Sequence, residues 1–159
     1  MKYIATKDKV TLLSKKGMKE LKKTIIILES DRHKLVKSLH ELDKTIGRDE
    51  RLTRIEKLAE LESIESELAD KNLLLASSEL IPTKRTHLRV AIGSVVDLID
   101  KHGHLFRYTV VNSVEADPSD GRISTKSPIG QSLLGRTVRD IIEWGNESKV
   151  NRLQLVRIL

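Results

Sequence analysis

Apolar residues in the first half of the chain repeat with the period of a helix that packs lengthwise against a partner. Between Ser14 and Ile81 there is no proline and no aromatic residue, and the only glycines are Gly17 and Gly47. The apolar residues before Gly47 are spaced alternately four and three apart, with Arg32 in one slot: Leu21, Ile25, Leu28, Leu35, Leu39, Leu42 and Ile46. A repeat of about 3.5 residues predicts a helix, here from 14 to 46, with Ser14 as its N-cap, in a coiled coil.

A second apolar series follows Gly47 with the same spacing. Glu65 and Asn72 hold two of its slots, and its apolar members are Leu58, Leu61, Leu68 and Leu75. Two long series joined at one glycine predict an antiparallel coiled-coil hairpin. We expect Gly47 to take the left-handed conformation that ends a helix, and Asp49 to cap a second helix that ends near Leu80. Each arm would be about 45–50 Å long at about 1.5 Å per residue, so the rod could carry a polar tip into a narrow site.

Strand and turn signals replace the helical period at Pro82. All three prolines and six of the eight glycines lie from this residue onward. Runs typical of strands occupy residues 91–100, 105–114 and 151–158, and residues 131–134 form a short helical piece. The sequence therefore predicts an α+β fold with two domains. Residues 1–81 form the coiled-coil finger, and residues 82–159 form a small antiparallel β domain.

Composition excludes several classes of protein. The chain has no cysteine, so a disulfide framework and a thiolate metal site are both excluded. No apolar run approaches the roughly 20 residues that a membrane span needs, and residues 1–5 lack the apolar run of a signal peptide. We expect a cytoplasmic protein without a membrane partner. The motifs of phosphate loops, dinucleotide sites, zinc proteases and serine hydrolases are missing from the sequence.

The net charge of +6 is unevenly distributed. Residues 14–46 carry nine basic and five acidic side chains, whereas residues 47–80 carry five basic and nine acidic ones. The two arms are therefore complementary in charge. The basic excess of the first arm and of residues 82–159 would suit a polyanion, and ordinary solvated lysines explain it equally well.

Three stretches of the chain resemble the bacterial Gre transcription elongation factors, GreA and GreB. Residues 13–21 (LSKKGMKEL) resemble the opening pattern LTxxGxxKL, and residues 93–98 (GSVVDL) resemble GSxVxL. Residues 124–135 (STKSPIGQSLLG) resemble SxxSPIGxALLG, preceded by Glu-Ala-Asp at 115–117. The order of the motifs is that of the family, and together they cover nearly the whole chain.

The resemblance implies a partner and a mode of action. Members of this family join a coiled-coil finger to an FKBP-like C-terminal domain, which holds the rim of the RNA polymerase secondary channel. The loop formed by Ser127, Pro128, Ile129 and Gly130 would lie near the polymerase-binding surface. The finger enters the channel, where acids at its tip hold a second magnesium ion beside the nascent RNA 3′ end and help the polymerase cleave backtracked RNA. The protein would be a monomer without an intrinsic cofactor or metal site, and not itself an enzyme.

The tip departs from the family pattern GDLSENAEY, which carries two acids three residues apart. Here the tip carries Asp49 and Glu50 among the basic residues Arg48, Arg51 and Arg54, and it is one residue shorter. Adjacent acids at a helix start diverge and suit chelation poorly, and three arginines compete with a cation. We therefore expect a regulator that modulates or inhibits elongation with little transcript cleavage, with the three arginines as tip contacts.

Three alternatives remain open at this point. Asp49 and Glu50 could still hold magnesium in a cleavage factor of the GreA type. The chain could also be a coiled-coil adaptor that kept the Gre fold and binds another partner. A prolyl isomerase is the third, but residues 82–159 offer only Phe106, Tyr108 and Trp144 as aromatic residues. We interpret these three aromatic residues as core and rim residues.

Overall fold

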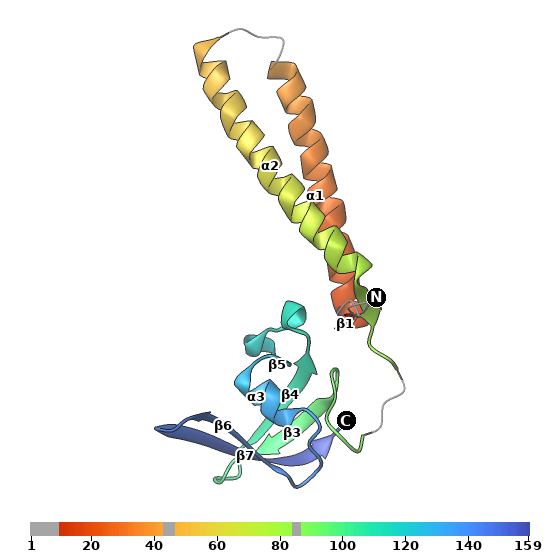
Figure 1. Ribbon diagram of the computed structural model, residues 1–159, viewed down its shortest axis with the longest axis vertical. Helices are drawn as coiled ribbons and strands as arrows, with labels where there is room; N and C mark the ends of the chain where they lie inside the picture. Colours follow the sequence, from red (N-terminus) through yellow and green to blue (C-terminus); the bar gives the residue numbers. More distant parts are fainter. Residues whose placement is uncertain (1–9, 43–46, 84–86) are drawn as a thin grey trace, which may run out of the picture. The chain divides into compact units, whose positions relative to one another are not determined.

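The computed structural model describes residues 10–42, 47–83 and 87–159. Within these residues the chain divides into two compact units (Figure 1). One unit contains the helical residues Met18–Ser78, and the other contains Thr11–Gly17 and Glu79–Leu159. The predicted domain boundary after residue 81 lies three residues beyond this division, and the segment Thr11–Gly17 belongs with the C-terminal unit. The predicted α+β fold class is confirmed, with a two-helix hairpin followed by a mainly antiparallel sheet.

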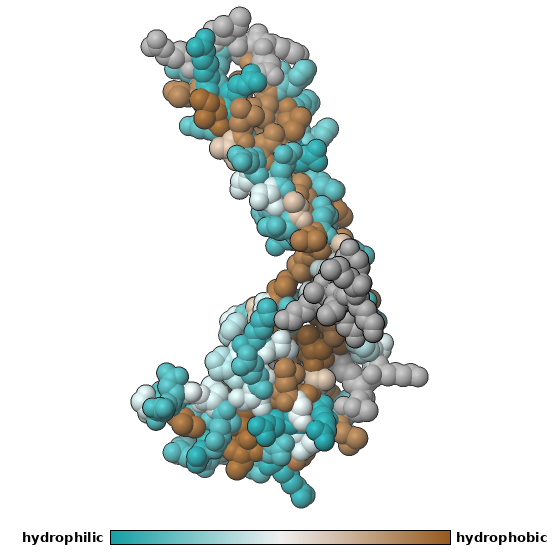
Figure 2. Space-filling view, viewed as in Figure 1, coloured by the Kyte–Doolittle hydropathy of each residue, from teal (hydrophilic) through white to brown (hydrophobic). Residues whose placement is uncertain are grey.

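The hairpin consists of α1 (Lys15–Leu42) and α2 (Arg48–Ala76). The predicted series along α1 is confirmed, because Leu21, Ile25 and Leu39 are all at most 9% exposed. The remaining predicted residues of that helix, up to 46, lie outside the described residues. Both helices also carry apolar residues away from the partner helix, and Figure 2 shows hydrophobic side chains among the hydrophilic ones along the hairpin surface. Four of these side chains are at least half exposed: Ile26, Ile27, Leu52 and Ile55.

On α2, every second position that the sequence predicted for the contact face is exposed instead of buried. Leu68 is buried as predicted, but Leu58 is 44% exposed, and Glu65 and Asn72 are exposed. The slots are filled by the residues one position earlier, which are all half-buried: Lys57, Ile64 and Lys71. Ile64 supplies the apolar side chain that Glu65 cannot. The Lys57 stem covers apolar surface while its ammonium group donates to Ser38 Oγ of α1.

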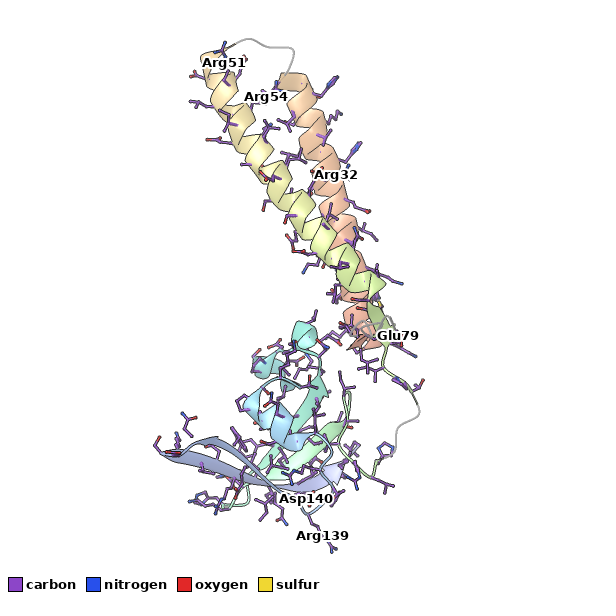
Figure 3. All side chains as sticks on the ribbon, viewed as in Figure 1. Arg32, Arg51, Arg54, Glu79, Arg139 and Asp140 are labelled. Carbon is purple, nitrogen blue, oxygen red and sulfur yellow. The ribbon has the colours of Figure 1, made fainter. Side chains whose placement is uncertain are left out.

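The two helices are also joined by an ion pair. Arg32 Nε lies 3.3 Å from Glu65 Oε1, and about half of each side chain is exposed. Arg32, labelled in Figure 3, is the polar residue within the apolar series of α1. The only charged slot of that series therefore faces an acid on α2. An exposed pair of this kind contributes about 0–1 kcal/mol, and its larger effect is to favour one register of the two helices.

The end of α2 was predicted four residues too late. The helix ends at Ala76, and residues 78–80 form a strand instead. This strand, β2 (Ser78–Leu80), pairs with β1 (Thr11–Leu13), and the Ile81 N–H donates to the Leu13 carbonyl at 2.9 Å. Pairing with a second strand outweighs the helix propensity of these residues.

A five-stranded sheet in the order β5-β4-β3-β7-β6 forms the C-terminal domain. Only the β4–β5 pair is parallel. The strands are β3 (Val95–Ile99), β4 (Leu105–Val111), β5 (Arg122–Ser124), β6 (Ile141–Asn146) and β7 (Lys149–Ile158). Two short 3-10 helices, η1 (Ser113–Glu115) and η2 (Pro118–Asp120), lie between β4 and β5. The sequence anticipated β3, β4 and β7 but not β5 or β6.

The core of this domain lies on one face of the sheet. Leu133, at the end of the short helix α3 (Pro128–Leu133), is fully buried there. It packs in one cluster with apolar residues of four strands: Val96, Leu98, Val110, Ile142 and Leu155. The likeness to FKBP expected for this domain stays a prediction.

The opposite face of the sheet holds a buried carboxylate between two arginines. Asp97 of β3 is 2% exposed and is the register partner of Arg107 on β4 and of Arg157 on β7. Arg107 donates from Nε to Oδ1 at 2.7 Å and from Nη2 to Oδ2 at 3.0 Å. Arg157 donates to Oδ2 from Nε at 3.1 Å and from Nη2 at 2.8 Å. The hydrogen bonds from Arg107, against the effect of burial and together with those from Arg157, lower the pKa of Asp97 to about 2.

The hairpin should depend on its buried contact face. We expect Leu39→Ala to lower the free energy of unfolding by about 2–4 kcal/mol, because it leaves a cavity between the helices. Leu58→Ala, at an exposed position, should cost less than about 1 kcal/mol. Helix unfolding followed by circular dichroism tests this difference, and equal losses in the two variants would contradict the contact face described above.

Asp97 should make stability depend on pH in a defined window. Its pKa of about 2 in the folded protein lies below the ordinary 3.8, so its contribution is present above pH 4 and is lost as pH falls from 4 to 2. We expect the loss to be about 2 kcal/mol. Asp97→Asn should be less stable at neutral pH and should lose less on acidification. Parallel urea titrations from pH 2 to pH 7 would count against this if both proteins lost stability equally.

Candidate functional site

The first turn of α2 contains the acids predicted at the tip. Gly47 is the N-cap with φ −104°, and Glu50 Oε2 accepts a hydrogen bond from the Gly47 N–H at 2.5 Å. The predicted left-handed conformation of Gly47 and the N-cap role of Asp49 are therefore both wrong. A Cβ on Gly47 would lie 2.7 Å from Glu50 Oε2, so a larger residue here would require the Glu50 side chain to shift. Glu50, the third residue of the helix, thus caps the N-terminus of α2 through the side-chain-to-backbone hydrogen bond of a capping box.

The remaining charges of this turn are exposed. Asp49 is exposed on the helix surface, and so are Arg51 and Arg54 (Figure 3). Arg48 begins the helix, but its side chain lies outside the described residues. Asp49 and Glu50 are adjacent in the helix, so their side chains diverge by about 100°. Among the described residues, no group of three or more histidine or acidic side chains could hold a metal ion.

The loop predicted to bind the polymerase begins α3. Ser127 is the N-cap, and its Oγ accepts a hydrogen bond from the Gly130 N–H at 3.1 Å. Pro128 is the first residue of the helix, where its missing N–H costs nothing. A Cβ on Gly130 would lie 1.9 Å from the Ser124 carbonyl oxygen, so only glycine fits. Ile129 is half-buried against the core, and the predicted contact role of the loop stays a prediction.

A groove beside this core gathers the aromatic residues of the domain. Phe106, Tyr108 and Trp144 are half-buried against the core, and all three line a groove of about 680 Å³. The Phe106 and Tyr108 rings are nearly parallel, with centroids 6.4 Å apart. The interpretation of these three side chains as core and rim residues did not include the groove that they line. Phe106 and Tyr108 are two residues apart on one strand and so share a face, and this spacing was the available signal.

Two motifs from distant parts of the sequence meet at the start of α1. Glu115 is 8% exposed and accepts hydrogen bonds from the Ser14 N–H at 2.8 Å and the Ser14 hydroxyl at 2.5 Å. Ser14 Oγ in turn accepts from the Gly17 N–H at 2.9 Å, which confirms Ser14 as the N-cap. A Cβ on Gly17 would lie 2.2 Å from Glu115 Oε1. Close packing against Glu115 therefore explains the glycine at position 17, which helix propensity alone does not.

Comparison with known proteins assigns the C-terminal domain. Residues 85–158 match the family described as "Transcription elongation factor, GreA/GreB, C-term". Residues 85–158 therefore form a C-terminal domain of the GreA/GreB family. The match contains the α3 loop, the aromatic groove and Glu115. These are therefore features of a GreA/GreB C-terminal domain.

Several GreA proteins are similar to this chain. It is 40% identical to GreA of Clostridioides difficile over 70 residues, which are 43% of this chain and 44% of that protein. It is 37% identical to GreA of Helicobacter pylori over 81 residues, which are 50% of this chain and 49% of that protein. These two alignments span about half the length of the curated relatives. GreA of Halalkalibacterium halodurans is 26% identical over 93% of this chain and 98% of its own length.

Two solved structures are also similar to this chain. The structure of the transcription factor Gfh1 is 24% identical, with 94% of this chain and 97% of that chain covered and a TM-score of 0.45. The GreA/GreB factor from Nitrosomonas europaea is 28% identical, with 67% of this chain and 91% of that chain covered and a TM-score of 0.42. No helix among the described residues is long and apolar enough to cross a membrane.

Gly17→Ala should destabilise the protein although alanine favours helices. Alanine gains about 1 kcal/mol of helix propensity, but its Cβ displaces the Glu115 carboxylate, and each hydrogen bond lost to a charged group costs about 1.5–3 kcal/mol. In a Glu115→Ala background the same change should be stabilising. A double-mutant cycle followed by thermal unfolding measures both effects, and additive free energies would refute the contact.

Proposed function

We propose that this protein is a transcription elongation regulator that binds RNA polymerase through its C-terminal domain and inserts its hairpin into the secondary channel. There it modulates or inhibits RNA synthesis and stimulates little transcript cleavage. In this proposal the protein is a monomer of the cytoplasm and carries no cofactor of its own. Any cleavage would use the active site and the magnesium ions of the polymerase.

Docking through the C-terminal domain is supported by the family match. Residues 85–158 are the part of the chain that matches the GreA/GreB description, and they include the loop Ser127 to Gly130. That loop starts a short helix whose Ile129 reaches the core. A loop fixed by an N-cap and a tightly packed glycine can present a defined surface to a partner.

The first turn of α2 is the observation that favours inhibition over cleavage. A cleavage factor must present clustered carboxylates to a metal ion. Here Glu50 Oε2 already accepts the Gly47 N–H at 2.5 Å. Binding a metal ion through Glu50 would therefore release the cap of the helix, which typically costs about 1 kcal/mol.

The basic residues give the tip a different preference. Arg51 and Arg54 are exposed on the first two turns of α2, and Arg48 precedes them in sequence. Guanidinium groups are attracted to carboxylates and phosphates. A polymerase active site offers both, as the acidic ligands of its magnesium ions and the phosphates near the RNA 3′ end. A tip held by these groups would block the channel.

Transcription on a stalled, backtracked elongation complex tests the proposal. We expect the unmodified protein to slow RNA extension and to leave the transcript length unchanged. Arg51→Glu with Arg54→Glu should weaken inhibition by about tenfold or more, since two charges reverse at the contact. Arg48→Asp should shift the protein towards cleavage. Lys22→Glu with Lys23→Glu, an equal charge reversal on exposed residues of α1, serves as the matched control.

Two results would contradict the proposal in different ways. Rapid shortening of RNA that Asp49→Ala with Glu50→Ala abolishes would show a cleavage factor in which the adjacent acids hold the metal. Failure of the full-length protein to bind core RNA polymerase would instead favour an adaptor that kept the fold.

A further inference from the structure

The outer face of the C-terminal sheet carries an arginine pair with unused donors. Asp97, buried between Arg107 and Arg157, engages Nε and one N–H of Nη2 on each guanidinium. Arginine has five N–H donors, so three on each side chain point away from Asp97. The two side chains are 55% and 56% exposed. The Nη2 atoms of both lie within 3.0 Å of the same carboxylate oxygen, Oδ2.

The charge at this point of the sheet is not balanced. One carboxylate faces two guanidinium groups, so the cluster keeps an excess charge of +1. The two cations are held close together by Asp97, and a second anion on their solvent side would relieve their repulsion. A carboxylate is the natural ligand, because guanidinium groups bind carboxylates through paired, parallel hydrogen bonds. The pair is therefore preorganised for an acid that approaches from outside.

An apolar row lies next to the arginine pair on the same face. The strand register places Leu105 opposite Ile99 and places Gln154 between Ile99 and Ile141. Leu105 and Ile141 are both 60% exposed. Alternation along β4 puts Leu105 and Arg107 on one face and Phe106 and Tyr108 on the core face. A cation pair beside exposed aliphatic side chains is typical of protein interfaces, in which arginine is enriched.

The rest of this face argues against a nucleic acid. Two of its other arginines are neutralised locally, because Arg152 pairs with Glu143 at 2.6 Å and Arg122 pairs with Asp120 at 3.2 Å. A surface that follows a phosphate backbone needs a run of unbalanced cations. Sheets that bind single strands also stack bases on aromatic side chains. The three described aromatic side chains lie with the core on the other face.

We propose that this outer face is a protein-docking surface on which Arg107 and Arg157 jointly receive a glutamate or aspartate side chain of the partner. Leu105 and Ile141 cover apolar residues that flank that acid. The inference rests on the proposed function, which makes RNA polymerase the partner. The surface is distinct from the loop at Ser127 to Gly130, so it would form a second contact with the same partner.

Affinity of the full-length protein for purified core RNA polymerase tests this surface at low and high salt. We expect Leu105→Ala with Ile141→Ala to weaken binding at least fivefold without unfolding, since both side chains are exposed. Arg107→Lys with Arg157→Lys keeps the charges but loses the forked donors, and should weaken binding at least tenfold. The matched controls are Val114→Ala in η1 and Arg136→Lys in the turn after α3, two exposed residues away from this face, which should bind normally.

The outcomes separate this inference from the proposed function. Tight binding of the unmodified protein with unchanged affinity in both face variants overturns the docking surface and leaves the proposed function in place. A lack of binding by the unmodified protein overturns both. Equal weakening in the face variants and in the controls also overturns the surface, because the loss would then not depend on this face. Thermal unfolding of every variant shows whether the Arg107→Lys, Arg157→Lys protein folds. If it does not, the affinity of the Leu105→Ala, Ile141→Ala protein decides whether the docking surface exists.

Discussion

The hydrogen bonds between Glu115 and the residues that begin α1 are the constraint on which the N-terminal end of this helix depends. A helix start leaves N–H groups without partners, and a buried carboxylate is costly unless donors surround it. Here the two requirements are satisfied together. The Glu115 carboxylate accepts hydrogen bonds from the Ser14 N–H and hydroxyl, and Ser14 Oγ accepts one from the Gly17 N–H. The residues are 101 positions apart in sequence. The long first helix therefore begins within the folded C-terminal unit.

This constraint connects motifs that looked independent in the sequence. The opening motif contains Gly17, and the Glu-Ala-Asp motif contains Glu115. Read alone, a glycine in the first helical turn weakens a helix, and a lone glutamate before a turn suggests only a surface residue. The structure gives them one physical reason, since the carboxylate occupies the space that a Cβ on Gly17 would fill.

The fold was more predictable than the site. Burial follows an apolar period directly, so Leu21, Ile25 and Leu39 could be placed from spacing alone. On α2 the choice between Leu58 and Lys57 depends on the partner helix, because a lysine stem can fill an apolar slot. The cap formed by Glu50 depends on the conformation of Gly47, and Asp97 meets Arg107 and Arg157 only through strand register. Such contacts are three-dimensional, and local patterns do not contain them.

The pairing of Arg32 with Glu65 also limits how the length of this hairpin can change during evolution. An insertion in one arm alone would separate the two charges and misalign every helix–helix contact beyond that point. Arms can therefore lengthen only by matched insertions. A change of a single residue in length is tolerated where it leaves the facing residues of α1 and α2 aligned. The register of the paired helices thus constrains the length of each arm, whereas substitutions of exposed residues in the first turn of α2 leave that register unaffected.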